Sequence, residues 1–195
     1  MISLVSAAVN GNDIPDKYKE TPEFLWPRQC DRLEALGRTG IARCYLYNLN
    51  KTSRPLYCEK TPRVRTELEL WDIASEERLT DYKKRGSSES MLCHYFDKLL
   101  RVAILDPETT QNDWLVQEGR NRVKDLVSVC LNFGNTGSVD MQLIADCVSE
   151  YQKAVNDICQ GWSTPLLFFM VLITLFGTQE SNNWQSTLYQ PMWGH

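Results

Sequence analysis

Few residues of this chain can do chemistry, and their spacing limits what they can do. Asp31 lies in a polar segment, and neither of the two histidines, His94 and His195, precedes an aspartate. A catalytic metal needs about three fixed protein ligands and an open position for water. A single carboxylate holds a divalent ion only weakly, so Asp31 alone does not make a metal site.

Two roles are open to Asp31. It either pairs with Arg28 or Arg32 on the same helix, or it is one ligand of a metal site. In the second case Glu34 and Asp97 are carboxylates that would have to join it. Nothing in the sequence forces those two side chains to its side.

The basic residues and His94 also have plain structural explanations. His94 lies in an apolar helical stretch, which favours a partly buried histidine on a packed helix face. Arg43 and Arg54 are either solvated or ion-paired. The run Lys83-Lys84-Arg85 is predicted to be a solvated loop.

Composition excludes several classes of protein. The chain has 195 residues, 43% hydrophobic and 24% charged, which is enough for one domain with a core. Its net charge of −4 and pI of about 5.3 give no strong nucleic-acid signal. The seven cysteines form no CxxC pair, so a zinc knuckle is not expected and no cofactor is predicted. We expect reduced thiols in the cytoplasm or another reducing compartment.

The spacing of apolar residues predicts an all-α helical bundle. Gly37 and Gly40 are expected to allow close packing or a kink, and Pro27 suits a first helical turn. The expected helices cover residues 2–10, 28–49, 67–85, 88–104, 109–133 and 139–160.

Cap residues mark the ends of the last three helices. A serine of the Ser87–Ser90 segment is expected to cap the first, Thr109 or Thr110 the second, and Ser138 the third. Gly134 is expected to end the second of these helices.

The C-terminal part differs in kind. Residues 162–177 (WSTPLLFFMVLITLFG) are almost unbroken apolar, but a transmembrane helix needs about 20 such residues, so none is predicted. The run is expected either to be buried in the domain or to dock onto a partner. The tail after it is polar but carries Trp184, Tyr189 and Trp193. We therefore predict two parts, a helical domain over 1–161 and an apolar, aromatic-bearing extension over 162–195 that contacts protein partners.

Four motifs in order carry a family resemblance. They are Cys30–Gly37 (CDRLEALG) followed by GIAR, then RPLY at 54–57, HYFDKLL at 94–100, and Arg120 with Val123. Together they resemble the small stand-alone bacterial and fungal branch of the HD-domain phosphohydrolases, over residues 28–133. The resemblance covers the C-terminal part of that domain only.

The resemblance implies an all-α bundle with a divalent metal held by a His, an adjacent His-Asp pair and a distant Asp. Asp31 corresponds to the distant Asp, and the other three ligands have no counterpart here. The metal site is therefore expected to be degenerate, with Asp31 as a remnant and no catalytic residue assigned. The resemblance also implies a phosphate or substrate pocket, for which the matching residues are Arg32, Arg43, Arg54, His94 and Lys98.

These observations favour a degenerate HD-domain protein that acts as a non-catalytic binding or structural subunit of a larger assembly. The alternative is a metal-dependent phosphohydrolase for a nucleotide or other phosphate ester. That activity requires a fuller chain or a partner to supply the missing ligands, together with Mn, Fe, Ni or Mg. A third hypothesis is a nucleotide-binding module that keeps the pocket without the metal.

Overall fold

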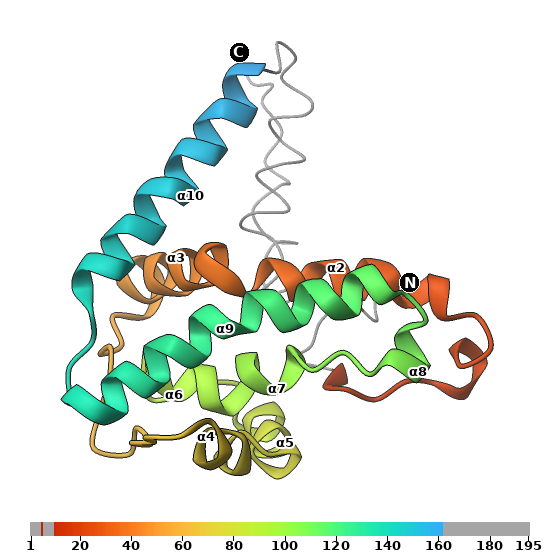
Figure 1. Cartoon of the computed structure of the whole chain (residues 1–195), viewed down its shortest axis with the longest axis horizontal. Helices are drawn as coiled ribbons and strands as arrows, with labels where there is room; N and C mark the ends of the chain where they lie inside the picture. Colours follow the sequence, from red (N-terminus) through yellow and green to blue (C-terminus); the bar gives the residue numbers. More distant parts are fainter. Residues whose placement is uncertain (1–4, 6–9, 162–195) are drawn as a thin grey trace, which may run out of the picture. The chain divides into compact units, whose positions relative to one another are not determined.

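The computed structural model describes Val5 and residues 10–161. Within this part the chain is helical and has no strand, so the predicted all-α fold is confirmed (Figure 1). The predicted helix at 2–10 and the apolar segment at 162–177 lie outside the described residues, apart from Val5 and Asn10. None of the helices described is both long and apolar enough to cross a membrane.

The elements are η2 (Asp16–Tyr18), η3 (Pro22–Leu25), α2 (Trp26–Glu34), α3 (Gly37–Tyr47), η4 (Asn48–Thr52), α4 (Glu67–Ile73), α5 (Glu76–Arg85), α6 (Met91–His94), η5 (Tyr95–Leu99), α7 (Leu100–Val102), α8 (Pro107–Thr110), α9 (Asp113–Thr136) and α10 (Met141–Gly161).

The chain divides into two compact units after Lys153, inside α10. In the first unit the long helix α9 contacts α2, α3, α4, α7 and α8 (Figure 1). One large apolar core joins these helices, so segments 28–50 and 88–133 pack together. Its members include Leu33, Leu36, Ile41, Met91, Leu92, Tyr95, Phe96, Leu126, Cys130, Phe133, Ile144 and Cys147.

The segment expected as one helix over 28–49 is two helices, α2 and α3. Gly37 has a φ of +65°, a conformation that L side chains rarely adopt, and it starts α3. At Gly40 an added Cβ would lie 2.2 Å from the carbonyl oxygen of Ala35. The break between α2 and α3 therefore requires glycine at both positions. This agrees with the expectation that these glycines allow close packing or a kink.

Two predicted caps are wrong by a few residues. The N-cap of α9 is Asn112, whose side chain accepts from a backbone N–H in the first turn, because Thr109 and Thr110 belong to the separate short helix α8. At the start of α10 the carboxylate of Asp140 accepts from two backbone N–H groups, the role that was expected of Ser138. Asn and Asp are at least as good N-caps as Ser and Thr, so composition alone did not separate them.

Gly134 does not end α9. The helix continues to Thr136 and stops at Gly137, which has a φ of +76°. A Cβ at Gly134 would lie 1.7 Å from the carbonyl oxygen of Val64, so glycine is needed there for backbone contact. The expected helix end is therefore a packing site.

The segment expected as one helix over 67–85 is two helices, α4 and α5. The run Lys83-Lys84-Arg85 is the last turn of α5, not a loop. Cations are favourable at a helix C-terminus because the last carbonyl groups carry partial negative charge. Gly86, with a φ of +71°, ends the helix.

The helix predicted over 88–104 is interrupted. Ser90 caps α6, as expected for the serine segment, by accepting from the backbone N–H of Cys93. The next five residues, Tyr95–Leu99, form a π-helical turn in which the N–H of Leu100 bonds the carbonyl of Tyr95. Such single turns widen a helix locally and occur often at functional sites.

Candidate functional site

Helix α2 buries two arginines one turn apart. Arg28 is 2% exposed and Arg32 is 5% exposed, on the same helix face as the buried Leu25 and Leu33. Residues four apart lie on one face of a helix, which explains why both guanidinium groups enter the protein together. Charged residues are rarely buried unless they are paired, so their partners decide what this face does.

The two guanidinium groups converge on backbone carbonyls. Arg28 donates from Nη1 to the carbonyl of Asp13 at 2.7 Å and from Nη2 to the carbonyl of Gly11. Arg32 donates from Nη2 to the same carbonyl of Gly11. The Nε atoms of both arginines are buried and have no hydrogen-bond partner. No carboxylate of the described residues forms an ion pair with either side chain.

This burial shows in the acid–base behaviour of both groups. Burial lowers the pKa of Arg28, and the carboxylate of Asp13 opposes this only in part. Burial also lowers the pKa of Arg32 to about 9, and the positive charge of Arg28 adds to the effect. The negative charges of Asp31 and Glu76 act in the opposite direction on Arg32, but they do not restore its ordinary pKa. A bound anion would therefore stabilise the pair.

A cavity of about 190 Å³ adjoins the arginine pair. Two further lining residues, Asn12 and Gln29, each have a buried side-chain oxygen without a partner. The acidic residues of the lining are already engaged: Glu76 binds Arg101 at 2.7 Å, and Asp106 caps α8. The lining consists of Asn12, Ile14, Arg28, Gln29, Arg32, Glu76, Arg101, Ile104, Leu105, Asp106 and Thr109, and we call this space the arginine cavity.

Charge interactions link the predicted pocket residues, because Lys98 and Arg54 act on His94, and Arg32 and Arg43 act on Lys98. Lys98, on the π-helical turn, is 9% exposed, and its Nζ lies 5.7 Å from the centre of the Tyr82 ring. Burial lowers the pKa of Lys98, the charge of Asp31 opposes this, and the charges of Arg32 and Arg43 add to it. Lys98 forms no ion pair with any carboxylate of the described residues.

His94 lies half-buried on α6, as its apolar neighbours predicted. Its ring is 5.3 Å from that of Tyr82. Burial lowers the pKa of His94 to about 3, and the charges of Lys98 and Arg54 lower it further. The imidazole is therefore neutral at pH 7, and it is influenced by two of the cations that the motifs grouped with it.

Asp31 faces this basic region without forming the predicted ion pair with Arg28 or Arg32, because both arginines bind Gly11 instead. Burial raises the pKa of Asp31, and the charges of Arg43 and Lys98 oppose the rise. Arg43 itself is held by Glu34, with 3.5 Å from its Nη1 to a carboxylate oxygen.

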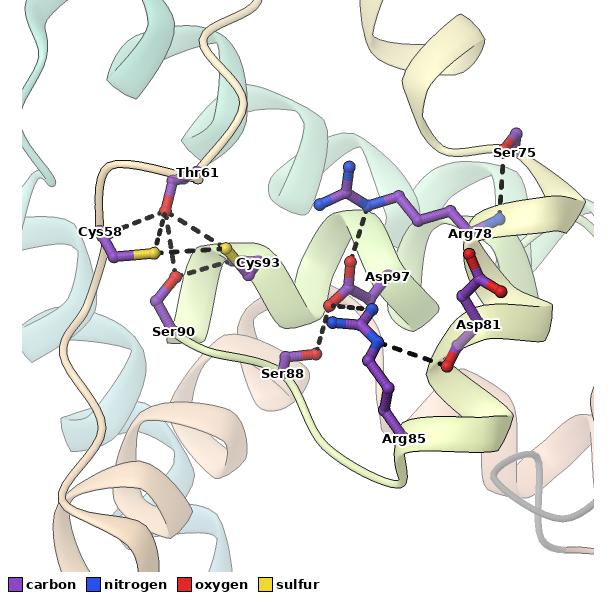
Figure 2. Close-up of polar contacts among 10 residues, drawn as sticks. All are labelled: Cys58, Thr61, Ser75, Arg78, Asp81, Arg85, Ser88, Ser90, Cys93 and Asp97. Atoms are coloured by element: carbon purple, nitrogen blue, oxygen red, sulfur yellow. Dashed lines mark hydrogen bonds and ion pairs between the residues drawn. The ribbon is translucent and has the colours of Figure 1, made fainter.

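The two carboxylates considered as further metal ligands have other partners. Glu34 binds Arg43, while Asp97 is 2% exposed and accepts from Arg78 at 2.7 Å and from Ser88 at 2.6 Å (Figure 2). Arg85 completes the group at 3.5 Å. Within residues 10–161 no group of three or more His, Cys, Asp or Glu side chains is arranged to hold a metal ion.

Sequence reasoning missed part of the arginine cavity. Arg28, Gln29 and Arg101 were not assigned to a site, and Arg28 was considered only as a partner for Asp31. A signal was available, because Leu25 and Leu33 define the buried face of α2, and residues 28, 29 and 32 share that face at helical spacing.

Comparison with known proteins relates the chain to a viral protein. It is similar to the uncharacterized protein L803 of Acanthamoeba polyphaga mimivirus, with 35% identity over 133 residues. The match covers 68% of this chain and 53% of the viral protein, so the chain spans about half the length of that relative. No protein-family model matches the chain, and no solved structure matches it.

Proposed function

We propose that this chain is a degenerate HD-type helical module that binds an anionic ligand and does not hydrolyse it. The observation that carries the proposal is the pair of buried guanidinium groups, Arg28 and Arg32, whose hydrogen bonds go only to backbone carbonyls. A buried cation without a counter-charge is costly, and it is retained most readily where a ligand supplies that charge.

The chemistry of the pair favours a phosphate group as the anion. A guanidinium presents donors in a planar fork that matches two oxygens of a phosphate or carboxylate. Both Nε donors of the pair are unused, and the arginine cavity has room for a small oxyanion. The resemblance implies that the cations Arg54 and Lys98, with the neutral ring of His94, contact the rest of a phosphorylated ligand.

A phosphohydrolase is the second candidate. It is supported by the motif around Asp31 and by the length of the viral relative, about half of which lies outside the match. A fuller chain or a partner would have to supply the His and His-Asp ligands, with Mn, Fe, Ni or Mg. Hydrolysis of a generic phosphate ester in the presence of each metal tests this candidate, and activity that is lost in Asp31→Ala would favour it over simple binding.

The binding proposal is tested by titrating the full chain with inorganic phosphate and with a nucleotide in a calorimeter. We expect saturable binding that Arg32→Gln weakens at least tenfold and Arg28→Gln weakens similarly. Arg65→Gln is the matched control, because Arg65 is exposed and does not line the cavity. Equal affinity in all four proteins, or no binding to the wild type, would contradict the proposal.

We also propose that the module belongs to a larger assembly in a reducing compartment such as the cytoplasm, with residues 162–195 forming the contact. The apolar composition of that segment supports this. Deletion of 162–195 is expected to release the chain from partners that co-purify with it. A deleted chain that keeps the same partners, measured by size-exclusion chromatography and mass spectrometry, would contradict the proposal.

A further inference from the structure

Two cysteines from distant parts of the sequence meet at the start of α6. Cys58 lies in the loop between η4 and α4, and Cys93 lies in the first turn of α6 (Figure 2). Their sulfur atoms are 3.8 Å apart. The six cysteines whose side chains are described are all free thiols, and no other two of them are in contact through sulfur.

The backbone holds these thiols next to each other. The N–H of Met91 donates to the carbonyl of Pro55 at 3.0 Å, and the N–H of Leu92 donates to the carbonyl of Leu56 at 2.9 Å. The loop therefore runs against the first turn of α6 over the residues just before Cys58. A disulfide needs a sulfur–sulfur distance of about 2.05 Å. Closure must bring the sulfurs from 3.8 Å to that distance, and one of the two is carried by a loop, not by a helix.

The hydroxyl groups of Thr61 and Ser90 lie beside the two sulfurs. Thr61 donates from Oγ1 to the sulfur of Cys58 at 3.7 Å, and this oxygen lies 3.4 Å from the sulfur of Cys93. The hydroxyl of Ser90 lies 3.1 Å from the same Thr61 oxygen. Figure 2 shows the four side chains as one compact group.

The consequence is an asymmetric pair. At Cys58 burial acts to raise the pKa, but hydrogen bonds from Thr61, the backbone of Lys60 and other neighbours outweigh it, so the pKa of the thiol lies below its usual value. Burial raises the pKa of Cys93. Cys58 is also the more exposed of the two, and a thiolate is the nucleophile in disulfide exchange. The pKa shifts in the opposite direction at three other thiols: burial raises the pKa of Cys44 to about 12 and also raises the pKa of Cys130 and of Cys147.

We propose that Cys58 and Cys93 form a reversible redox pair that closes to an intramolecular disulfide on reaction with a low-molecular-weight disulfide such as oxidised glutathione. The thiolate of Cys58 attacks one sulfur of the small disulfide and releases one small thiolate. Cys93 then loses its proton and attacks the sulfur of Cys58, which releases the second small thiol. The protein loses two hydrogen atoms and the small disulfide is reduced to two thiols.

Closure links the loop that carries Arg54 to the helix that carries His94. The two basic-region residues then sit on segments joined by a covalent bond. The disulfide itself does not depend on the proposed anion binding, so each idea can fail without the other. A change in phosphate affinity on oxidation is a separate observation that would connect the two.

The test uses the full chain, incubated with oxidised glutathione, alkylated, digested and mapped by mass spectrometry. We expect a cross-linked peptide that joins Cys58 to Cys93, loss of two alkylatable thiols, and full recovery with a reductant. Cys93→Ala is expected to stop at a stable mixed disulfide on Cys58, because the second step has no attacking thiol. Cys58→Ser is expected to leave Cys93 largely unmodified.

Cys30→Ser is the matched control, because Cys30 is exposed and has no cysteine partner among the described side chains. This variant should form the Cys58–Cys93 disulfide as the wild type does. The wild-type map decides the question even if a variant fails to fold. A disulfide between other cysteines, a stable mixed disulfide on wild-type Cys58, or unreacted Cys58 and Cys93 would overturn the proposal.

Discussion

Two groups of buried charged residues in the first unit differ in their partners. Asp97 has two arginine partners and a serine hydroxyl, so its charge is balanced inside the protein. Arg28 and Arg32 are also buried, but both donate to the carbonyl of Gly11, and each has an unused donor. The first arrangement is complete without a ligand and stabilises the fold. The second has donors left over, which is the property expected of a binding site.

Removal of Asp97 should have the largest effect. Asp97→Ala breaks a buried ion pair and leaves Arg78 and Ser88 without their acceptor, so we expect the free energy of unfolding to fall by about 3–5 kcal/mol. Urea denaturation measures this. The control is Glu150→Gln, which removes an exposed partner of Arg38 and should change little. A small loss for Asp97→Ala would show that the two regions differ less than their contacts indicate.

Removal of Arg32 should have the opposite sign in the absence of ligand. Arg32→Met keeps a long side chain and removes an unpaired buried charge, while Arg28 still serves the carbonyl of Gly11. We expect a gain of about 2 kcal/mol in the free energy of unfolding, with loss of phosphate binding. Destabilisation by Arg32→Met in phosphate-free buffer would mean that the arginine pair is structural, like Asp97.

A third substitution gives the arginine pair the partner that it lacks. Gln29→Glu places a carboxylate in the lining of the arginine cavity, and a hydrogen bond to a charged group contributes about 1.5 kcal/mol. The variant should therefore be more stable than the wild type and bind phosphate more weakly, because the charge is already balanced. Gln29→Met is the matched control without a charge. An unchanged phosphate affinity in Gln29→Glu would place the anion elsewhere.

The smallest expected effect concerns His94, a half-buried ionisable group. Its pKa is about 3 in the folded protein, against an ordinary value of 6.5. The unfolded chain therefore binds a proton that the folded protein does not, and stability falls as the pH drops below 6.5. For one such group the loss between pH 7 and pH 6 is at most about 0.7 kcal/mol. His94→Gln should remove this part of the pH dependence in urea denaturation, and His195→Gln should not.

The sequence predicted the fold class because long apolar stripes at helical spacing leave little choice of architecture. It misplaced two caps, since Asn112 and Asp140 cap as well as the neighbouring Thr and Ser residues. Gly134 was mistaken for a helix end because only the structure shows the carbonyl of Val64 beside it. The sequence does not distinguish a glycine that is needed for close backbone contact from one that ends a helix.

The candidate site was predictable in part. The motifs around Asp31 and His94 pointed to residues that interact through their charges in the structure. A motif records the spacing of residues along the chain, which composition does not. The arginine cavity was not predicted beyond Arg32. Its defining property is that no carboxylate of the described residues forms an ion pair with Arg28 or Arg32. Ion pairing depends on which side chains meet in the folded protein, so the sequence does not show it. The chain has several acids close by in sequence, and none of those described forms an ion pair with these two arginines.

The π-helical turn at Tyr95–Leu99 has a consequence for how this protein compares with its relatives. One residue fewer in this turn would restore a regular α-helix and rotate the residues before the turn by about 100° relative to the residues after it. Cys93 and His94 would then face a different direction from the one in which they meet the loop, while Lys98 and Leu99 stayed in place. A relative with an unbroken helix here should therefore show a one-residue gap in the alignment. Even if that relative has both cysteines, their sulfur atoms should not lie next to each other.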